Sequence, residues 1–509
     1  MWPLSSYPEF SLKEVSDEYD YIIFGGGTAG AALANRLSAQ EANKVLTRKI
    51  LSVSQNSLGR SIELFTGSVL GETSRINQML YEDIKPYFSK SERALYPCDA
   101  DVHSTEARVV YSDLVHRVIE ASEALGLPRI RDINSPVHPV VGCGLLHFTR
   151  DKNQHRSSTY TACLHIVTHT EAIKLSFKSE SSLGKLTVDR VKLKSRNSTR
   201  ERVVKARKEV ILCGGPFGSP HLLMLSGIGP APHLKEKDIP LVRDLPAVGF
   251  NLQDHFGVSV AFEVPTSHSL LSLQKRPWIF FIELFKYVLF GTGILLAPVL
   301  QIALFASSLL LNEEGSPTST EVHGNVLPDI EIMPMAYDST DDLETSRGMF
   351  SFLNVLLHPE SKGTVRLSSA DPSNPLVIDP QYLSNPADYA PLRASLKLTL
   401  RLRDRMIEQG YPLKDFGVPT GEDDASLDKF ICKRNRTTYH YSSTCRMGPD
   451  NGEQDGGVVN EELFVHGFDN LRIADSSVFL WVPGTHLQAP SVALAEKCAD
   501  MILSRHSEV

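Results

Sequence analysis

The first regular pattern of apolar positions lies close to the amino terminus. A run of mostly apolar, β-forming residues at 19–24 is followed by glycine-rich residues 25–30 and then by the small helix formers of 31–38. That order predicts a strand, a tight turn and a helix. Residues 44–54 fit a second strand, and residues 164–212 alternate short β-like runs with charged turns.

Helical periodicity appears at three later places. Apolar residues recur on one face over 113–125 and 388–408, and the last residues, from Pro490 onward, also favour a helix. Strands are predicted at 351–367 and 378–383. The chain therefore mixes helices and strands throughout, and no internal repeat is visible.

One uncharged apolar stretch runs from Tyr287 to Leu311 and is long enough to span a bilayer as a helix. Gly291, Gly293 and Pro298 interrupt it. We therefore expect a buried or pocket-lining segment here, and we do not expect a membrane as a partner.

The overall composition is that of an ordinary globular protein. The 509 residues are 42% hydrophobic and 22% charged; Lys and Arg number 52, Asp and Glu number 60, and the formal net charge is −8. Because no large cluster of Lys and Arg is present, nucleic acid is not expected as a partner.

Seven scattered cysteines show no C-x-x-C spacing, so neither a metal site nor a disulfide framework is predicted. The amino terminus lacks a basic segment followed by an apolar run. We therefore expect a cytoplasmic protein.

The glycine turn carries the dinucleotide-binding pattern G-x-G-x-x-G at Gly25, Gly27 and Gly30. Between a strand and a helix, such a turn lets the backbone approach a pyrophosphate at the helix amino terminus. An acidic residue about 20 positions further on normally holds the ribose, but no Asp or Glu lies between Glu41 and Glu63.

Five further segments with recognisable patterns follow along the chain. In sequence order they are Gly215–Gly229, Val248–His255, His358–Leu367, Tyr439–Gly448 and Pro483–Pro490. With the glycine turn, they resemble the glucose-methanol-choline (GMC) oxidoreductases, and their spelling is most similar to the aryl-alcohol oxidase and choline dehydrogenase members. The resemblance extends from Tyr19 to about Ile502.

The resemblance implies an α/β fold, α+β overall, with a Rossmann-like FAD-binding domain and a substrate domain built on an antiparallel sheet. By this comparison, residues 1–90, 160–260 and 455–509 form the discontinuous FAD-binding domain. Residues 91–159 and 261–454 form the substrate-binding domain.

The resemblance also implies which residues contact FAD: Gly25, Gly27, Thr28, Ala29, Gly30, Gly71, Thr73, Ser74, Asn77, Ile173, Ala474, Asp475, Leu487 and Gln488. Glu72 and Gln78 replace two glycines of the family's flavin loop, and two family segments on either side of that loop look missing. We therefore expect FAD to be bound non-covalently and weakly.

By the same resemblance, His440 is the catalytic base and His486 its hydrogen-bonding partner. An imidazole with a pKa near 6.5 can accept a hydroxyl proton at neutral pH. Any single histidine among 17 is more often a surface or hydrogen-bonded residue, so the motifs carry this assignment.

The expected function is oxidation of an alcohol, primary or aryl, by hydride transfer to the flavin, with oxygen or another acceptor taking the electrons. A secondary-metabolite intermediate is one candidate substrate, by analogy only. Two alternatives stay open: a flavin-poor relic of the fold that acts as a binding protein, and a non-redox lyase.

Overall fold

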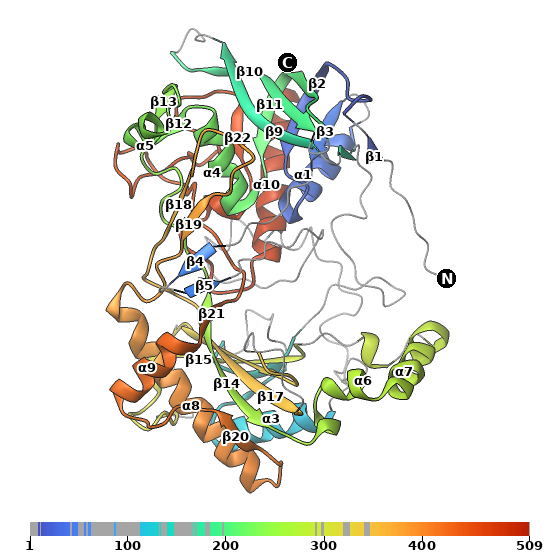
Figure 1. The fold of residues 1–509 in the computed structure, drawn as a ribbon, viewed down its shortest axis with the longest axis vertical. Coiled ribbons are helices and arrows are strands. Elements are labelled where there is room, and N and C mark those ends of the chain that lie inside the picture. Colours follow the sequence, from blue (N-terminus) through green and yellow to red (C-terminus); the bar gives the residue numbers. More distant parts are fainter. Residues whose placement is uncertain are drawn as a thin grey trace.

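The computed structural model contains two large β-sheets, one above the other in Figure 1. It describes residues 9–10, 12–40, 43–48, 55–57, 60–62, 86–87, 112–131, 133, 140–146, 166–167, 170–178, 184–195, 198–290, 293–296, 300–318, 326–339 and 347–507.

The upper sheet has the strand order β1-β8-β3-β2-β11-β10-β9, and β22 pairs with β11. Its strands are β1 (Glu9–Phe10), β2 (Glu18–Phe24), β3 (Val45–Arg48), β8 (Ile166–Val167), β9 (Thr170–Lys178), β10 (Thr187–Ser195), β11 (Glu201–Leu212) and β22 (Leu471–Ile473). The pairs from β1 to β11 and the β11–β22 pair are parallel, whereas β9, β10 and β11 form an antiparallel meander.

Helices α1 (Thr28–Ser38) and α10 (Gln488–Ser507) pack against each other beside this sheet (Figure 1). The alanine-rich α1 buries Ala29, Leu33 and Leu37 on the strands, because a helix of small residues can approach a sheet closely. The predicted strand–turn–helix unit and the final helix are thus confirmed. The second predicted strand covers 45–48, and residues 49–54 lie outside the described part.

The lower sheet has the order β20-β14-β17-β16-β15-β7-β6, with β21 also paired to β14. Its strands are β6 (Arg129–Ile130), β7 (Gly142–Leu145), β14 (Phe256–Glu263), β15 (Ile302–Ala306), β16 (Ile330–Met335), β17 (Met349–Leu356), β20 (Lys414–Gly417) and β21 (Asn435–Thr437). All of its pairs are antiparallel except β6–β7.

Three helices cover the lower sheet: α3 (Ser112–Ala124), α8 (Tyr389–Glu408) and α9 (Asp424–Arg434). Leu392, Leu396 and Met406 lie on the buried side of α8, as the helical periodicity predicts. The lower sheet and these helices share one hydrophobic core, separate from that of the upper sheet. The predicted mixed architecture, with a parallel-type sheet and an antiparallel sheet, is confirmed; the domain boundaries stay a prediction.

The remaining strands and α-helices complete the described part of the chain. They are the strands β4 (Gln55–Ser57), β5 (Arg60–Ile62), β12 (Ile228–Gly229), β13 (Arg243–Asp244), β18 (Thr364–Arg366) and β19 (Val377–Asp379), and the helices α4 (Gly215–Leu225), α5 (Ala231–Glu236), α6 (Leu271–Lys275) and α7 (Pro277–Phe290). The strand expected over 378–383 ends at Asp379, because Pro380 cannot donate to a ladder and Gln381 has a positive φ.

The apolar stretch from Tyr287 to Leu311 divides into two parts. Residues 302–306 form the buried strand β15, as expected for a core segment. Residues 288–290, at the end of α7, are exposed, so the expectation of burial was wrong there. In the described part of the chain, no helix combines the length and apolar character needed to cross a membrane.

Candidate active site

The pairing of β14 with β21 brings two distant histidines together. Phe256 lies opposite Thr437 in this antiparallel pair, and the backbone N–H of Thr438 donates to the His255 carbonyl at 2.9 Å. His255, immediately before β14, and His440, shortly after β21, therefore lie side by side. Tyr439 has φ +66°, a left-handed conformation that turns the chain immediately before His440.

A short contact joins the two imidazoles. Nδ1 of His255 lies 3.0 Å from Nδ1 of His440, and Nε2 of His255 lies 3.0 Å from the Leu357 carbonyl. A carbonyl only accepts, so Nε2 of His255 carries the proton and donates to it. In the neutral ring Nδ1 is then an acceptor, and Nδ1–H of His440 is the donor.

Thr438 supports the same tautomer of His440. Its hydroxyl donates to the His255 carbonyl at 2.7 Å, which leaves only lone pairs to face Nδ1 of His440 at 3.3 Å. Both neighbours therefore accept from Nδ1–H of His440. Nε2 of a neutral His440 consequently keeps its lone pair, and no described residue donates to it.

His486 lies on the other side of His440. The ring centroids are 4.7 Å apart and the rings are inclined by 56°. Nε2–H of His486 donates to Oε1 of Glu331 on β16 at 3.2 Å, and the Glu331 side chain is almost fully buried. The structure thus brings together the two histidines singled out in the sequence and adds a carboxylate to the pair.

The environment separates the proton affinities of the histidines. Burial, with the adjacent His486 and His255, holds the pKa of His440 well below 6.5. Burial also lowers the pKa of His255, to about 3. Burial opposes the charge on His486 too, but the attraction of Glu331 outweighs it and raises the pKa of His486. The cluster therefore combines neutral imidazoles with one that favours its protonated form, a division typical of acid–base sites.

Asp254 anchors the backbone of His440. Its Oδ1 accepts the His440 N–H at 2.7 Å, and its Oδ2 accepts hydroxyl groups from Tyr382 and Thr437. Burial raises the pKa of Asp254 to about 7, although these hydrogen bonds oppose the shift. The carboxyl group thus fixes where His440 lies without contacting its ring.

Gln253 connects the same strand to the His486 loop. Its Oε1 accepts the N–H of Val482 at 3.1 Å, and its amide donates to the Pro359 carbonyl at 2.9 Å. Consecutive residues 253–255 therefore hold the segments that carry His440 and His486, as well as the turn after β17.

A second set of predicted residues gathers at one edge of the upper sheet. Phe24, Leu212 and Ile473 lie in register at the carboxyl ends of β2, β11 and β22. The glycine turn after Phe24 and the Ala474–Asp475 segment after Ile473 therefore lie at the same edge of the sheet, on either side of the end of β11. Ligands of parallel sheets bind at this edge.

The glycine turn has the shape that a pyrophosphate site requires. Gly25 has φ +119°, and a Cβ there would lie 2.0 Å from the Cys213 carbonyl oxygen. A Cβ on Gly30 would lie 1.9 Å from the Gly25 carbonyl oxygen, whereas nothing lies within 4 Å of one on Gly27. Thr28 and Ala29 begin α1 beside this open space, so backbone N–H groups can reach an anion.

Two buried polar atoms lie near His486 and are able to hydrogen-bond a ligand. Oγ1 of Thr485 and Oε1 of Gln488 are buried and have no hydrogen-bond partner among the described residues. They flank His486 and Leu487 where α10 begins. Buried polar atoms normally have partners, so these two fit the polar edge of a flavin ring.

The other predicted cofactor residues are placed less directly. The Asp475 carboxylate accepts from Gly215 N–H at 2.9 Å, Ser219 Oγ at 2.6 Å and Ser477 N–H at 2.8 Å, so its oxygens are already engaged. Ile173 lies half-buried on β9. Gly71, Thr73, Ser74 and Asn77, with Glu72 and Gln78, lie outside the described residues.

Sequence reasoning did not assign roles to His255, Asp254 or Glu331. His255 and Asp254 belong to the Val248–His255 segment, which resembles the family but carries no pattern that indicates a role for either residue. Glu331 had a local signal: it is a lone acid between the buried Ile330 and Ile332. A charge at a core position of a strand is unusual unless it has a partner.

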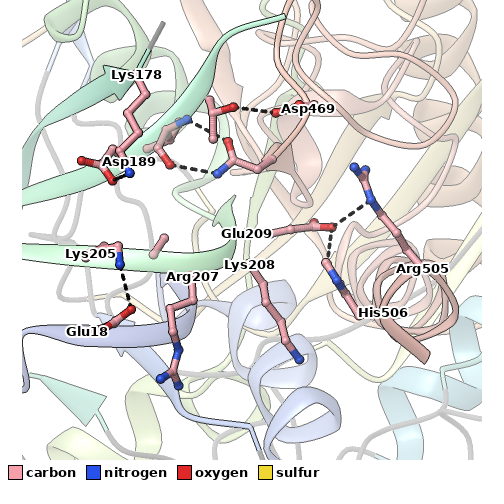
Figure 2. A pocket seen from close by; sticks show the side chains of 14 residues that line it. Glu18, Lys178, Asp189, Lys205, Arg207, Lys208, Glu209, Asp469, Arg505 and His506 are labelled. Carbon is pink, nitrogen blue, oxygen red and sulfur yellow. Dashed lines mark hydrogen bonds and ion pairs between the residues drawn. The ribbon is translucent and has the colours of Figure 1, made fainter. Parts of the chain in front are cut away.

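A cleft of about 450 Å³ lies elsewhere, at the opposite end of the upper sheet (Figure 2). Several of its charged groups are paired with one another: Lys178 with Asp189, Lys205 with Glu18, and His506 with Glu209. It opens at the amino end of β2, away from the edge where such sheets bind ligands. We therefore assign it a structural role.

Comparisons with known proteins identify the family of the chain. A family model described as GMC oxidoreductase matches in two parts, an amino-terminal one over residues 79–257 and a carboxyl-terminal one over 359–495. Residues 1–78, which hold the glycine turn, lie outside the amino-terminal match.

The chain is 30% identical to an oxygen-dependent choline dehydrogenase of Pseudomonas savastanoi pv. phaseolicola, over 96% of this chain and 94% of the relative. That alignment has 563 positions, more than the 509 residues of the chain, so the relative carries segments that this chain lacks.

Solved structures show the same fold. An FAD-dependent oxidoreductase from Chaetomium thermophilum has a TM-score of 0.79 at 20% identity, over 96% of this chain and all of that one. A fungal aryl-alcohol oxidase has a TM-score of 0.78 at 22% identity, with the same coverage.

Proposed function

Because the chain belongs to the GMC oxidoreductase family, we propose that it is an FAD-dependent enzyme that oxidises a primary or aryl alcohol with His440 as the base. The observation that carries this proposal is the chain of hydrogen bonds from the Leu357 carbonyl through His255 to His440. It leaves the lone pair of His440 Nε2 available to an incoming hydroxyl group.

In this mechanism His440 removes a proton and His486 stabilises negative charge. Nε2 of His440 accepts the hydroxyl proton of the alcohol. The His486 imidazolium, held by Glu331, stabilises the negative charge that develops on the alcohol oxygen. When bound, FAD supplies the acceptor for the hydride that leaves the carbinol carbon, so that the alcohol becomes an aldehyde or ketone.

The fit to FAD rests on this chain's own residues. The glycine turn would hold the pyrophosphate, and Thr485 and Gln488 would contact the polar edge of the ring. The missing acid after β3 removes one charge-assisted hydrogen bond, which costs about 1.5–3 kcal/mol, or roughly ten- to a hundredfold in affinity. No histidine lies between Gly67 and Tyr81 to tether the flavin covalently.

A cytoplasmic location remains part of the proposal. Among the described cysteines, Cys143, Cys213, Cys445 and Cys498 form no disulfide bond. Free thiols are typical of a reducing compartment.

The test is flavin reduction by an alcohol in the absence of oxygen. The absorbance spectrum of the purified protein reports bound flavin, and stopped-flow mixing with aliphatic, benzylic and choline substrates reports reduction. We expect yellow protein whose colour bleaches with at least one alcohol, and flavin that denaturant releases. Protein that does not bind added FAD would support the binding relic instead. Bound flavin that no alcohol bleaches would favour the lyase.

A further inference from the structure

Helix α7 stands away from the body of the molecule, beside the lower sheet (Figure 1). It has 14 residues, Pro277–Phe290, most of them aromatic or aliphatic. None of them is buried in the structure. An apolar helix normally packs into a core, so a partner outside the described residues must cover this one.

Six exposed side chains of α7 form a continuous stripe, hereafter the α7 stripe, while Phe280 and Phe290 are exposed on other sides of the helix. It consists of Trp278, Phe281, Ile282, Phe285, Val288 and Leu289, each between 48% and 64% exposed. Their spacing of three and four residues places them on one side of a helix. The stripe thus offers one face rich in aromatic rings rather than scattered apolar residues.

The one acid of the helix is turned aside from solvent. Glu283 pairs with Lys286 at 2.6 Å and accepts the Ile294 N–H at 2.8 Å, and its side chain is only 13% exposed. The stripe therefore presents no uncompensated negative charge.

Cations surround the stripe instead. Lys275 and Arg276 precede the helix and are exposed, as is Lys286. Residues 271–296 contain these three cations and one acid, Glu283, so their net charge is +2. The net charge of the whole chain is −8. The helix thus concentrates apolar surface and positive charge in one place.

The length of α7 decides how it can meet a bilayer. At about 1.5 Å per residue, 14 residues extend about 21 Å, which is less than the roughly 30 Å of a hydrocarbon core. The helix cannot cross, but it can lie in the interface with its apolar face among the acyl chains.

From these observations we propose that the α7 stripe docks the protein on the surface of a bilayer that contains anionic lipids. Phe and Trp side chains enter the boundary of the acyl chains, while Arg276 faces lipid phosphates and the net positive charge of residues 271–296 favours an anionic surface. This revises the expectation of no membrane partner: the contact is peripheral and requires no span. A second copy of the chain is a poorer fit, because a symmetric contact would bring the same cations face to face.

The test is flotation of the full-length protein with lipid vesicles. We expect the protein to float with vesicles of phosphatidylcholine that contain phosphatidylserine, and to float about tenfold less with phosphatidylcholine alone. Added salt should weaken the binding only in part, because the apolar contribution is not screened.

Variants separate the apolar and the charged contributions. Phe281→Ser with Phe285→Ser should lower binding to the anionic vesicles by about tenfold or more. Leu309→Ser is the matched control, because Leu309 is an apolar residue of another element and is 85% exposed. Arg276→Glu should weaken binding to anionic vesicles only, and Lys235→Glu, an exposed cation on α5, should not.

Other results would overturn the proposal. Protein that stays with neither kind of vesicle would mean that something else covers the stripe, including undescribed residues of this chain. Equal flotation of the Phe281→Ser/Phe285→Ser variant would place the lipid contact elsewhere. A dimer in sedimentation velocity that this variant dissolves would identify a second copy as the occupant.

Discussion

Nδ1 of His255 lies 3.0 Å from Nδ1 of His440, and this contact determines which nitrogen of His440 can act as a base. The Leu357 carbonyl fixes the proton of His255 on Nε2, and His255 in turn fixes the proton of His440 on Nδ1. A backbone carbonyl thus sets a tautomer two side chains away, which makes His255 a positioning residue.

The first prediction concerns His255 itself. His255→Ala removes the nearer of the two acceptors of His440 Nδ1–H, so the preference of His440 for that tautomer weakens. We expect flavin reduction by an alcohol to slow by about ten- to a hundredfold, as for other groups that orient a histidine, with flavin content unchanged. Added imidazole should restore part of the rate by occupying the vacated space. A rate equal to the parent's, or no rescue by imidazole, would contradict the positioning role.

The second prediction concerns the base. General-base catalysis typically contributes about 10²–10⁴-fold, so His440→Ala should lower kcat by that factor at unchanged flavin content. His486→Asn should be milder, because an amide can still hold the alcohol oxygen. His116→Ala is the control, since His116 is an exposed residue on α3. Flavin reduction at the parent rate in His440→Ala would remove His440 from the mechanism.

The third prediction concerns the pH dependence that Glu331 imposes. In the parent, Glu331 raises the pKa of His486, so the imidazolium persists to higher pH than that of an ordinary histidine and is lost as the pH rises through that pKa. In Glu331→Gln burial alone acts, and the pKa falls. The high-pH limb of kcat/KM should then move about one pH unit or more toward acid. Glu408→Gln, at an exposed position on α8, should leave the profile unchanged. An unmoved limb in Glu331→Gln would separate His486 from the pH profile.

The fourth prediction concerns stability and Asp254. Its pKa is about 7 in the folded protein and near 3.8 when unfolded. Between these values the unfolded chain has lost the proton that the folded chain keeps, so Asp254 makes the folded state less stable as the pH rises. The slope from this one group is at most about 1.4 kcal/mol per pH unit. Asp254→Asn should flatten the fall in the free energy of unfolding from pH 4 to pH 7, measured by urea titration. An identical slope in both proteins would show that Asp254 does not titrate there.

Local sequence was enough to predict the elements whose conformation depends mainly on residues close by in the chain. The strand, glycine turn and helix at 18–38 follow from a β-forming run, from glycines at positions where a Cβ would strike a carbonyl oxygen, and from helix formers. Helix α8 follows from its apolar periodicity. In contrast, α7 has the composition of a buried helix and is exposed, because burial depends on what packs against a segment and not on its own hydrophobicity.

The site required more than local pattern. The motifs indicated His440 and His486, but they are 46 positions apart, and nothing in their spacing says that their rings lie 4.7 Å apart. The sequence did not reveal Glu331 as the partner of His486, because that pair joins β16 to the loop before α10 across 155 positions.

The sequence by itself therefore determined the family resemblance, the main elements and the two candidate histidines, because each of these is recognised from a short run of neighbouring residues. The tertiary structure alone decided the protonation pattern of the site. A histidine's pKa and tautomer depend on burial and on the atoms around the ring, and here the Leu357 carbonyl, His255 and Glu331 come from three separate strands or turns. Only the pairing of β14 with β17 and β21, and of β16 with β17, brings those atoms together.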